Sequence, residues 1–139
     1  MAIYNKTDTG MLRMVTDCNI SSDTFKLMLT NTAPTSATSV KADLTEIASS
    51  ANYPAGGIVI GTTASQTGGV VSLTPSGDIV IAPGAGETIG PFRYVSMIDD
   101  TPADGPVISY YDRGSSVTLD GDNSDTFTID VGATLFTIS

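Results

Sequence analysis

The stretch Phe25-Lys26-Leu27-Met28-Leu29-Thr30 decides the class of fold. Its apolar residues Phe25, Leu27 and Leu29 occupy every second position, and a period of two residues places them on one face of an extended strand. The loop residues that follow, from Thr32 to Ser36, end the pattern. We therefore expect a half-buried β-strand over residues 25 to 30.

Further short runs rich in β-branched and aromatic residues follow, and Gly, Pro, Asp and Ser separate them. The predicted strands cover residues 58–63, 70–74, 79–81, 92–98, 107–111, 117–119, 127–131 and 135–138. In the run 92–98 the alternation places Phe92, Tyr94, Ser96 and Ile98 on one face. About eight or nine short strands without crossover helices predict an all-β fold, an antiparallel β-sandwich that is jelly-roll-like and has at most one short helix.

The only plausible helix of the sequence follows the first predicted strand. Asp43 and Glu46 have the spacing of a capping box, which predicts one or two helical turns over residues 43–48. The run Met11-Leu12-Arg13-Met14-Val15 fits either a strand or a single helical turn.

The chain divides into a weakly patterned start and one domain. Residues 1–22 are expected to form an N-terminal arm or a first strand, and residues 23–139 a single β-sandwich domain. The start is polar except for a few apolar side chains, which we expect to contact a partner protein or a neighbouring subunit. They are Ile3, Tyr4, Met11, Leu12 and Met14.

Composition excludes several classes of protein. The 139 residues include 15 Asp plus Glu against 6 Lys plus Arg, a net charge of −9, so a nucleic-acid partner is not expected. No apolar run is long enough to span a bilayer, and no secretory signal is apparent at the N-terminus. The single cysteine, Cys18, fits synthesis in a reducing cytoplasm, and we expect it to pack as a small apolar residue.

Catalysis and metal binding have little support in the residues. The sequence contains no histidine, which removes Ser-His-Asp and Cys-His mechanisms and His-ligated metals, so we expect no enzyme, no catalytic residue and no cofactor. The run Asp120-Gly121-Asp122-Asn123-Ser124-Asp125 has oxygen ligands for calcium but lacks the EF-hand Gly and Glu, so a solvated turn is expected. Asp99, Asp100 and Asp104 are likewise expected at a solvated loop tip without basic partners. The sequence therefore predicts no metal site.

Residues 25–34, Phe-Lys-Leu-Met-Leu-Thr-Asn-Thr-Ala-Pro, resemble a phrase common in small virion structural proteins of tailed bacteriophages. In that family a spacer and an Ala-Asp-hydrophobic-Thr-Glu-Ile-Ala block follow, and Ala42–Ala48 is similar to it. The likeness covers residues 24 to 138. Its other parts are Asn52–Gly57, Ile89–Val95, Asp99–Thr101, Tyr110–Ser115 and Phe127–Asp130. Family members often carry a longer N-terminal helix than residues 1–22 can supply.

The resemblance implies a non-enzymatic component of a virus particle. An acidic β-domain suits the outer surface of the head better than its DNA-filled interior, so the expected function is a capsid decoration (cement) protein that binds the major capsid protein. By analogy with other decoration proteins, a homotrimer is expected. The alternatives are a tail, collar or head-fibre component, or a carbohydrate-binding β-sandwich for adhesion. The absence of Trp and the 6% of aromatic residues weigh against the last of these.

Overall fold

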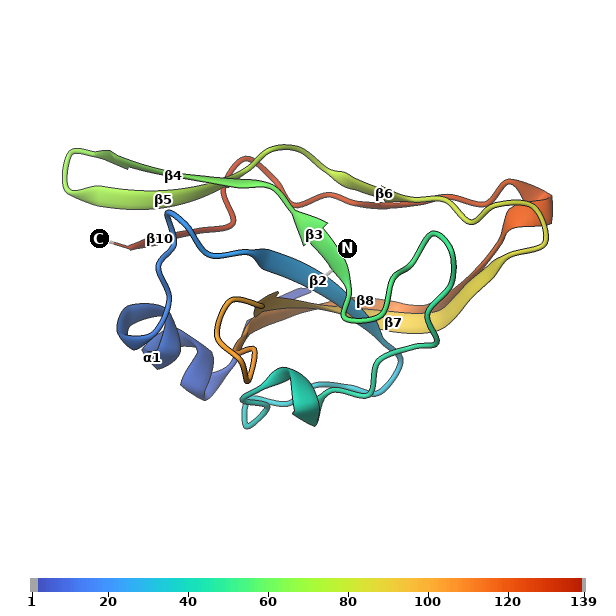
Figure 1. Ribbon diagram of the computed structural model, residues 1–139, viewed down its shortest axis with the longest axis horizontal. Coiled ribbons are helices and arrows are strands. Elements are labelled where there is room, and N and C mark those ends of the chain that lie inside the picture. The colour runs from blue at the N-terminus through green and yellow to red at the C-terminus, as the bar shows by residue number, and fades with distance from the viewer. Residues whose placement is uncertain (1–2, 139) are drawn as a thin grey trace.

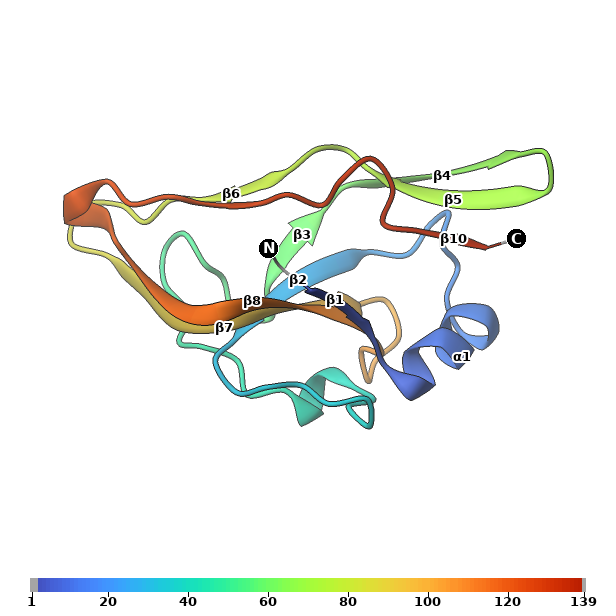
Figure 2. The ribbon, with the colours of Figure 1, turned by 180° about the vertical axis from the view of Figure 1, so that it is seen from behind.

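The structure is a computed structural model that describes residues 3 to 138, apart from the side chain of Ile3. Two layers of strands lie one above the other, and a short helix packs at one end (Figures 1 and 2). No helix among the described residues is long and apolar enough to cross a membrane.

The first layer is a five-stranded antiparallel sheet, called here the large sheet. Its order is β1 (Ile3–Lys6), β8 (Val107–Asp120), β7 (Thr88–Asp99), β2 (Phe25–Thr30) and β3 (Ile58–Ile60).

The second layer consists of two smaller antiparallel units. The small sheet has the order β10 (Phe136–Ile138), β5 (Val70–Pro75) and β4 (Thr62–Thr67), and β6 (Ile79–Ile81) pairs with β9 (Phe127–Ile129). The helical elements are α1 (Asp8–Thr16) and the short 3₁₀ turns η1 (Lys41–Asp43) and η2 (Gly121–Asn123).

The prediction of an all-β antiparallel sandwich with at most one short helix is confirmed, and α1 is the single α-helix of the described residues. Its jelly-roll connectivity stays a prediction. The segments 107–111 and 117–119, expected as two strands, belong to the single long strand β8, which pairs with β7 through shifts in register.

The main core lies between the two layers, as the sandwich requires. Phe25, Leu27 and Leu29 of β2 are at most 1% exposed, as the alternation predicts, and Leu73 and Ile81 of the second layer belong to the same buried cluster.

The other face of β2 is also buried, which the prediction of a half-buried strand did not include. Met28 is 4% exposed and forms a second cluster with Ile98 and Val107, against which Leu44 packs. The segment that carries η1 lies on this side of the large sheet (Figure 1). A covering segment without regular structure has no periodic sequence pattern. The alternation in residues 25–30 therefore predicted a solvent-facing side for β2 where this segment in fact covers it.

Two further expectations are corrected. Phe92 does not share a face with Ile98: a register shift between Phe92 and Tyr94 turns Phe92 into the main core, whereas Ile98 faces the second cluster. Residues 43–48 form no α-helix. The Asp43 carboxylate accepts from the backbone N–H groups of Ser39 and Val40, which closes only the 3₁₀ turn η1.

Glu46, expected in a capping box with Asp43, instead helps to close the edge of β2. Strand β3 pairs with β2 only as far as Leu27, so the Leu29 N–H has no strand partner on that side. The hydroxyl of the fully buried Tyr53 accepts this N–H at 2.9 Å and donates to Glu46 Oε1 at 2.8 Å. Glu46 also accepts from the Gly56 N–H at 2.9 Å. A chain of hydrogen bonds therefore replaces the missing strand, as buried backbone groups require.

Replacing Tyr53→Phe is expected to lower the free energy of unfolding by about 1 to 3 kcal/mol, because a buried N–H and a carboxylate lose their partner while the ring remains. The matched control is Tyr110→Phe, on a half-buried ring, with an expected change below about 0.5 kcal/mol. Urea denaturation measures both. Equal effects of the two substitutions would contradict the role of the Tyr53 hydroxyl.

Glu87 joins the loop that carries Asn52 to the loop that carries Gly84. Its carboxylate accepts from the backbone N–H groups of Asn52 and Gly84 at 2.8 and 2.7 Å. The neighbouring Ser50 hydroxyl and these two N–H groups favour the charged form and lower the pKa of Glu87 from 4.5 to about 2.

The lowered pKa of Glu87 predicts a pH-dependent contribution to stability. Because folding lowers the pKa, the contribution is present above the ordinary value of 4.5 and is lost as the pH falls towards about 2. Glu87→Gln should therefore reduce the free energy of unfolding at neutral pH, and its difference from the unchanged chain should shrink steadily in acid. Urea titrations over a series of pH values measure this difference. A difference that is constant with pH would show that the charge of Glu87 contributes nothing.

Candidate functional site

The N-terminal segment is an integral part of the fold. Strand β1 pairs with β8 at the edge of the large sheet, and α1 follows directly. The buried side chain of Thr7 caps the helix: its hydroxyl accepts from the Gly10 N–H at 3.1 Å and donates to the Val107 carbonyl at 2.6 Å. Residues 11–15, for which the sequence allowed a strand or a helical turn, are therefore helical. This helix depends on the cap at Thr7 and on its packing against β8.

The contact between α1 and β8 depends on a glycine. A Cβ atom at Gly10 would overlap the Val107 carbonyl oxygen and lie 2.7 Å from that of Ile108. Farther along the helix, Arg13 forms ion pairs with Asp17 and, at 2.9 Å, with Asp104. The Arg13 guanidinium holds the pKa of Asp104 below its usual value. Both ends of α1 are therefore fixed to the rest of the domain.

The five side chains predicted to contact other proteins lie in different environments. Tyr4 is 36% exposed and packs on Tyr111, with ring centroids 5.2 Å apart, and Leu12 is 63% exposed. Met11 is partly buried against the core, and Met14, at 3% exposure, is a core residue. The expectation that Met14 contacts another protein is wrong, because the face of α1 that carries it packs on the main core. The side chain of Ile3 lies outside the described residues.

Val15 was missed by the sequence reasoning, although it stands three residues after Leu12. It is 74% exposed, and residues three apart lie on the same face of a helix. Leu12 and Val15 therefore form an outward apolar pair on an anchored helix, called here the α1 pair.

Gly10→Ala is expected to destabilise the fold by about 3 kcal/mol, because the new methyl group overlaps backbone atoms that cannot move aside. Gly84→Ala is the control, since its Cβ would meet Asn52 and Glu87 side-chain atoms at 3.4 and 3.6 Å, which is ordinary contact. Thermal unfolding measures both variants. If Gly10→Ala is as stable as Gly84→Ala, the helix does not sit this close to β8.

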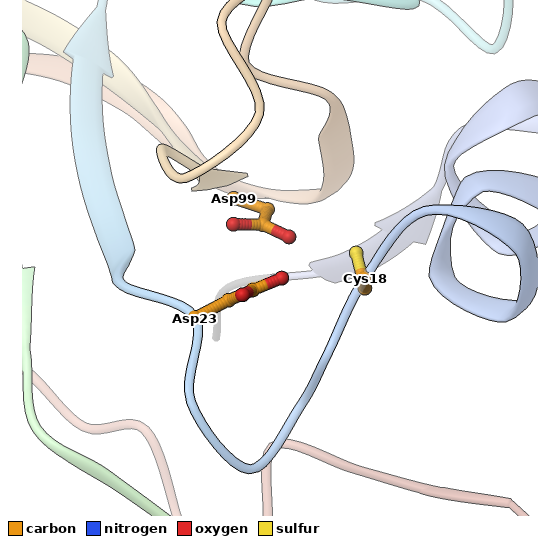
Figure 3. Close-up of side chains that lie close together, drawn as sticks. All are labelled: Cys18, Asp23 and Asp99. Atoms are coloured by element: carbon orange, nitrogen blue, oxygen red, sulfur yellow. The ribbon is translucent and has the colours of Figure 1, made fainter.

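A cluster of three polar side chains lies where the loop after α1 meets the end of β7. Cys18 Sγ and carboxylate oxygens of Asp23 and Asp99 all lie within 4.8 Å of one another (Figure 3). Asp99 is fully buried, whereas Cys18 and Asp23 are half-buried. Asp99 Oδ1 accepts from the Thr101 N–H at 3.1 Å, and Oδ2 has no hydrogen-bond partner.

The cluster has unusual electrostatics. Burial, followed by the neighbouring Asp23 carboxyl, raises the pKa of Asp99, although the Cys18 thiol and the Thr101 N–H lower it. Burial and the neighbouring Asp99 carboxylate raise the pKa of the Cys18 thiol. Cys18 packs partly buried against the main core, as expected, and its Sγ also lies beside these two carboxylates. Local patterns could not reveal the cluster, because Asp99 is far from Cys18 and Asp23 in the sequence.

The neighbouring loop carboxylates have basic partners, contrary to expectation. Asp100 contacts Lys26 at 2.6 Å and Lys41 at 2.9 Å, and Asp104 contacts Arg13. These ion pairs join the loop after β7 to β2, η1 and α1. They are structural, and Asp99 is buried in place of the expected solvated position.

The run Asp120–Asp125 forms the turn that its composition predicts. Asp120 accepts from the backbone N–H of Asp122 at 3.0 Å, and Asp125 accepts from that of Asp120 at 3.0 Å. Asp122 accepts from the Gly86 N–H at 2.7 Å. The carboxylates are therefore used within the turn and its neighbour.

A pocket of about 500 Å³ opens beside β8 and β9. Tyr111, Arg113 and Phe127 are among its lining residues. The Arg113 guanidinium lies over the Phe127 ring, 5.9 Å from its centroid, and Phe92 packs on that ring at 5.1 Å. Phe127 thus contacts both Phe92 and Arg113 in the wall of the pocket.

Comparisons with protein families, with curated proteins and with solved structures found no match to this chain.

Proposed function

We propose that this chain is a structural protein of a tailed-phage particle and decorates the outer surface of the shell built by the major capsid protein. The observation that carries the proposal is the resemblance of residues 24–138 to small virion structural proteins. The proposed mechanism is repeated binding of modest interfaces, amplified by the symmetry of the shell, with three copies grouped at each local threefold position.

The segments that carry the resemblance form one structural unit. Residues 25–30 are strand β2 of the large sheet, and the Ile47 N–H of the second segment donates to the Leu29 carbonyl at 3.1 Å. Arg93 and Asp112, from the two later segments, form a charged pair at 2.7 Å between β7 and β8. The likeness therefore falls on residues that build the sheet, which is what a shared scaffold with variable surfaces would leave.

The α1 pair is the surface that we assign to the capsid. Leu12 and Val15 are exposed on a helix held by Thr7, Gly10 and Arg13, so their contact would cost little ordering entropy. The net charge of −9 disfavours DNA as the partner and leaves a protein surface as the chemistry that fits.

Copy number in purified particles is the first measurement. Decoration predicts about one copy per capsid subunit, or about one per three, by quantitative peptide mass spectrometry. A few tens of copies would instead place the protein in the tail, the collar or a head fibre. Absence from purified particles would overturn the virion proposal.

Leu12→Asp and Val15→Asp should each weaken binding to particles that lack the protein by at least about tenfold, because a charge enters an apolar contact. Val80→Asp is the control, since Val80 has the same side chain as Val15 and is 61% exposed on β6. Deletion of the segment is avoided, since β1 and Met14 belong to the fold. Unchanged binding of both α1 variants, or equal weakening by Val80→Asp, would contradict this assignment.

A further inference from the structure

Asp99 is the feature of the described structure that most needs a partner. It ends β7, its side chain is fully buried, and Oδ2 has no hydrogen bond. A buried carboxylate oxygen without a partner is costly, so a proton or a cation is expected there. The cations nearby are otherwise engaged: in the described part of the chain the ion pairs of Lys26 and Lys41 go to Asp100, and those of Arg13 to Asp17 and Asp104.

The side chains that face Asp99 are both potential metal ligands. Figure 3 shows Cys18 and Asp23 on one loop, with their polar atoms towards the Asp99 carboxylate. The loop is held in this shape by its own hydrogen bonds: Asp23 Oδ2 accepts from the Asn19 N–H at 2.6 Å, and the Asp23 N–H donates to the Asn19 carbonyl at 2.8 Å. The loop therefore presents a sulfur and a carboxylate to the buried Asp99.

Backbone N–H groups hold both carboxylates in place, as the groups around the ligands of a metal site do. Asn19 holds one oxygen of Asp23, and Thr101 holds Asp99 Oδ1, which leaves Oδ2 of Asp99 without a partner. Such hydrogen bonds from neighbouring groups position ligands in metal sites of proteins. Cys18 and Asp23 are half-buried, so an ion can reach the cluster from solvent.

We propose that Cys18 Sγ, Asp23 and Asp99 bind one divalent, thiophilic cation of the zinc class. A thiolate beside two carboxylates suits Zn²⁺, which takes sulfur and oxygen ligands together, whereas Ca²⁺ and Mg²⁺ prefer oxygen alone. Ligands of tetrahedral zinc lie about 3.5 Å apart, so side chains now within 4.8 Å need to move inwards by about 1 Å. Three protein ligands leave the fourth position to water.

The consequence is a cross-link between distant parts of the chain. The ion would join the loop after α1 to the last residue of β7, which is the middle strand of the large sheet. A thiolate released from its proton binds the metal, and the proton leaves to solvent, so the binding needs no oxidant or reductant. The inference stands on this cluster alone and does not depend on the virion proposal.

Cobalt is the probe that reports the sulfur ligand directly. The full chain, reduced and freed of metal, is titrated with Co²⁺ while its absorption spectrum is recorded. Binding of a single equivalent should give a thiolate-to-cobalt charge-transfer band and the visible bands of tetrahedral cobalt, and Zn²⁺ should displace both. Cys18→Ser should remove the charge-transfer band, and Asp99→Asn should weaken binding by at least about tenfold. Asp104→Asn, on a nearby carboxylate outside the cluster, is the matched control and should bind as the unchanged chain does.

Thermal unfolding supplies a second measurement that does not use cobalt. Zinc should raise the melting temperature of the unchanged chain and of Asp104→Asn by about 5 °C or more at saturating concentration, and should leave Asp99→Asn unchanged. Asp23→Asn, at a half-buried position, replaces Asp99→Asn if the latter does not fold. Failure to bind cobalt or zinc at millimolar concentration overturns the proposal and points to a proton shared by the carboxylates. Binding that survives both Cys18→Ser and the aspartate variant places the ion elsewhere and also overturns it.

Discussion

Strand β2 must be paired along both edges and covered on both faces, and the rest of the structure depends on this constraint. Its first face packs on the second layer, and its second face is covered through Met28 and the cluster around Val107. Strand β7 pairs along its whole length, but β3 covers only half of the opposite edge. Tyr53 and Glu46 complete that edge, which is why an irregular segment carries two of the most constrained polar groups in the fold.

The N-terminal segment also covers an edge of the large sheet and packs against it. Strand β1 closes one edge of the large sheet, and α1 packs so closely on β8 that only glycine fits at residue 10. The loop after the helix therefore lies at the end of β7, where Cys18 and Asp23 are close to Asp99. The outward side of the same helix carries Leu12 and Val15. One anchored segment thus supplies both the inward cluster and the outward apolar pair.

The two proposals assign different tasks to this anchored segment. As a decoration protein, the chain would use a rigid sandwich to present a small apolar contact many times over a symmetric shell. A metal ion between the loop after α1 and β7 would stabilise the position of α1, which carries this apolar contact, without itself touching the capsid. Either proposal can fail while the other stands, because Leu12 and Val15 are exposed whereas Asp99 is buried.

The sequence by itself determined the all-β class, because alternation at β2 and short runs between turn residues are local consequences of side-chain geometry. It also excluded histidine chemistry, and its Asp120–Asp125 run specified a turn from residue types alone. Only the tertiary structure decided that Met14 is buried, that Phe92 and Ile98 face opposite sides, and that Asp99 lies beside Cys18. The physical reason is that a register shift, a covering loop and a contact between distant segments leave no periodic trace in the residues that form them.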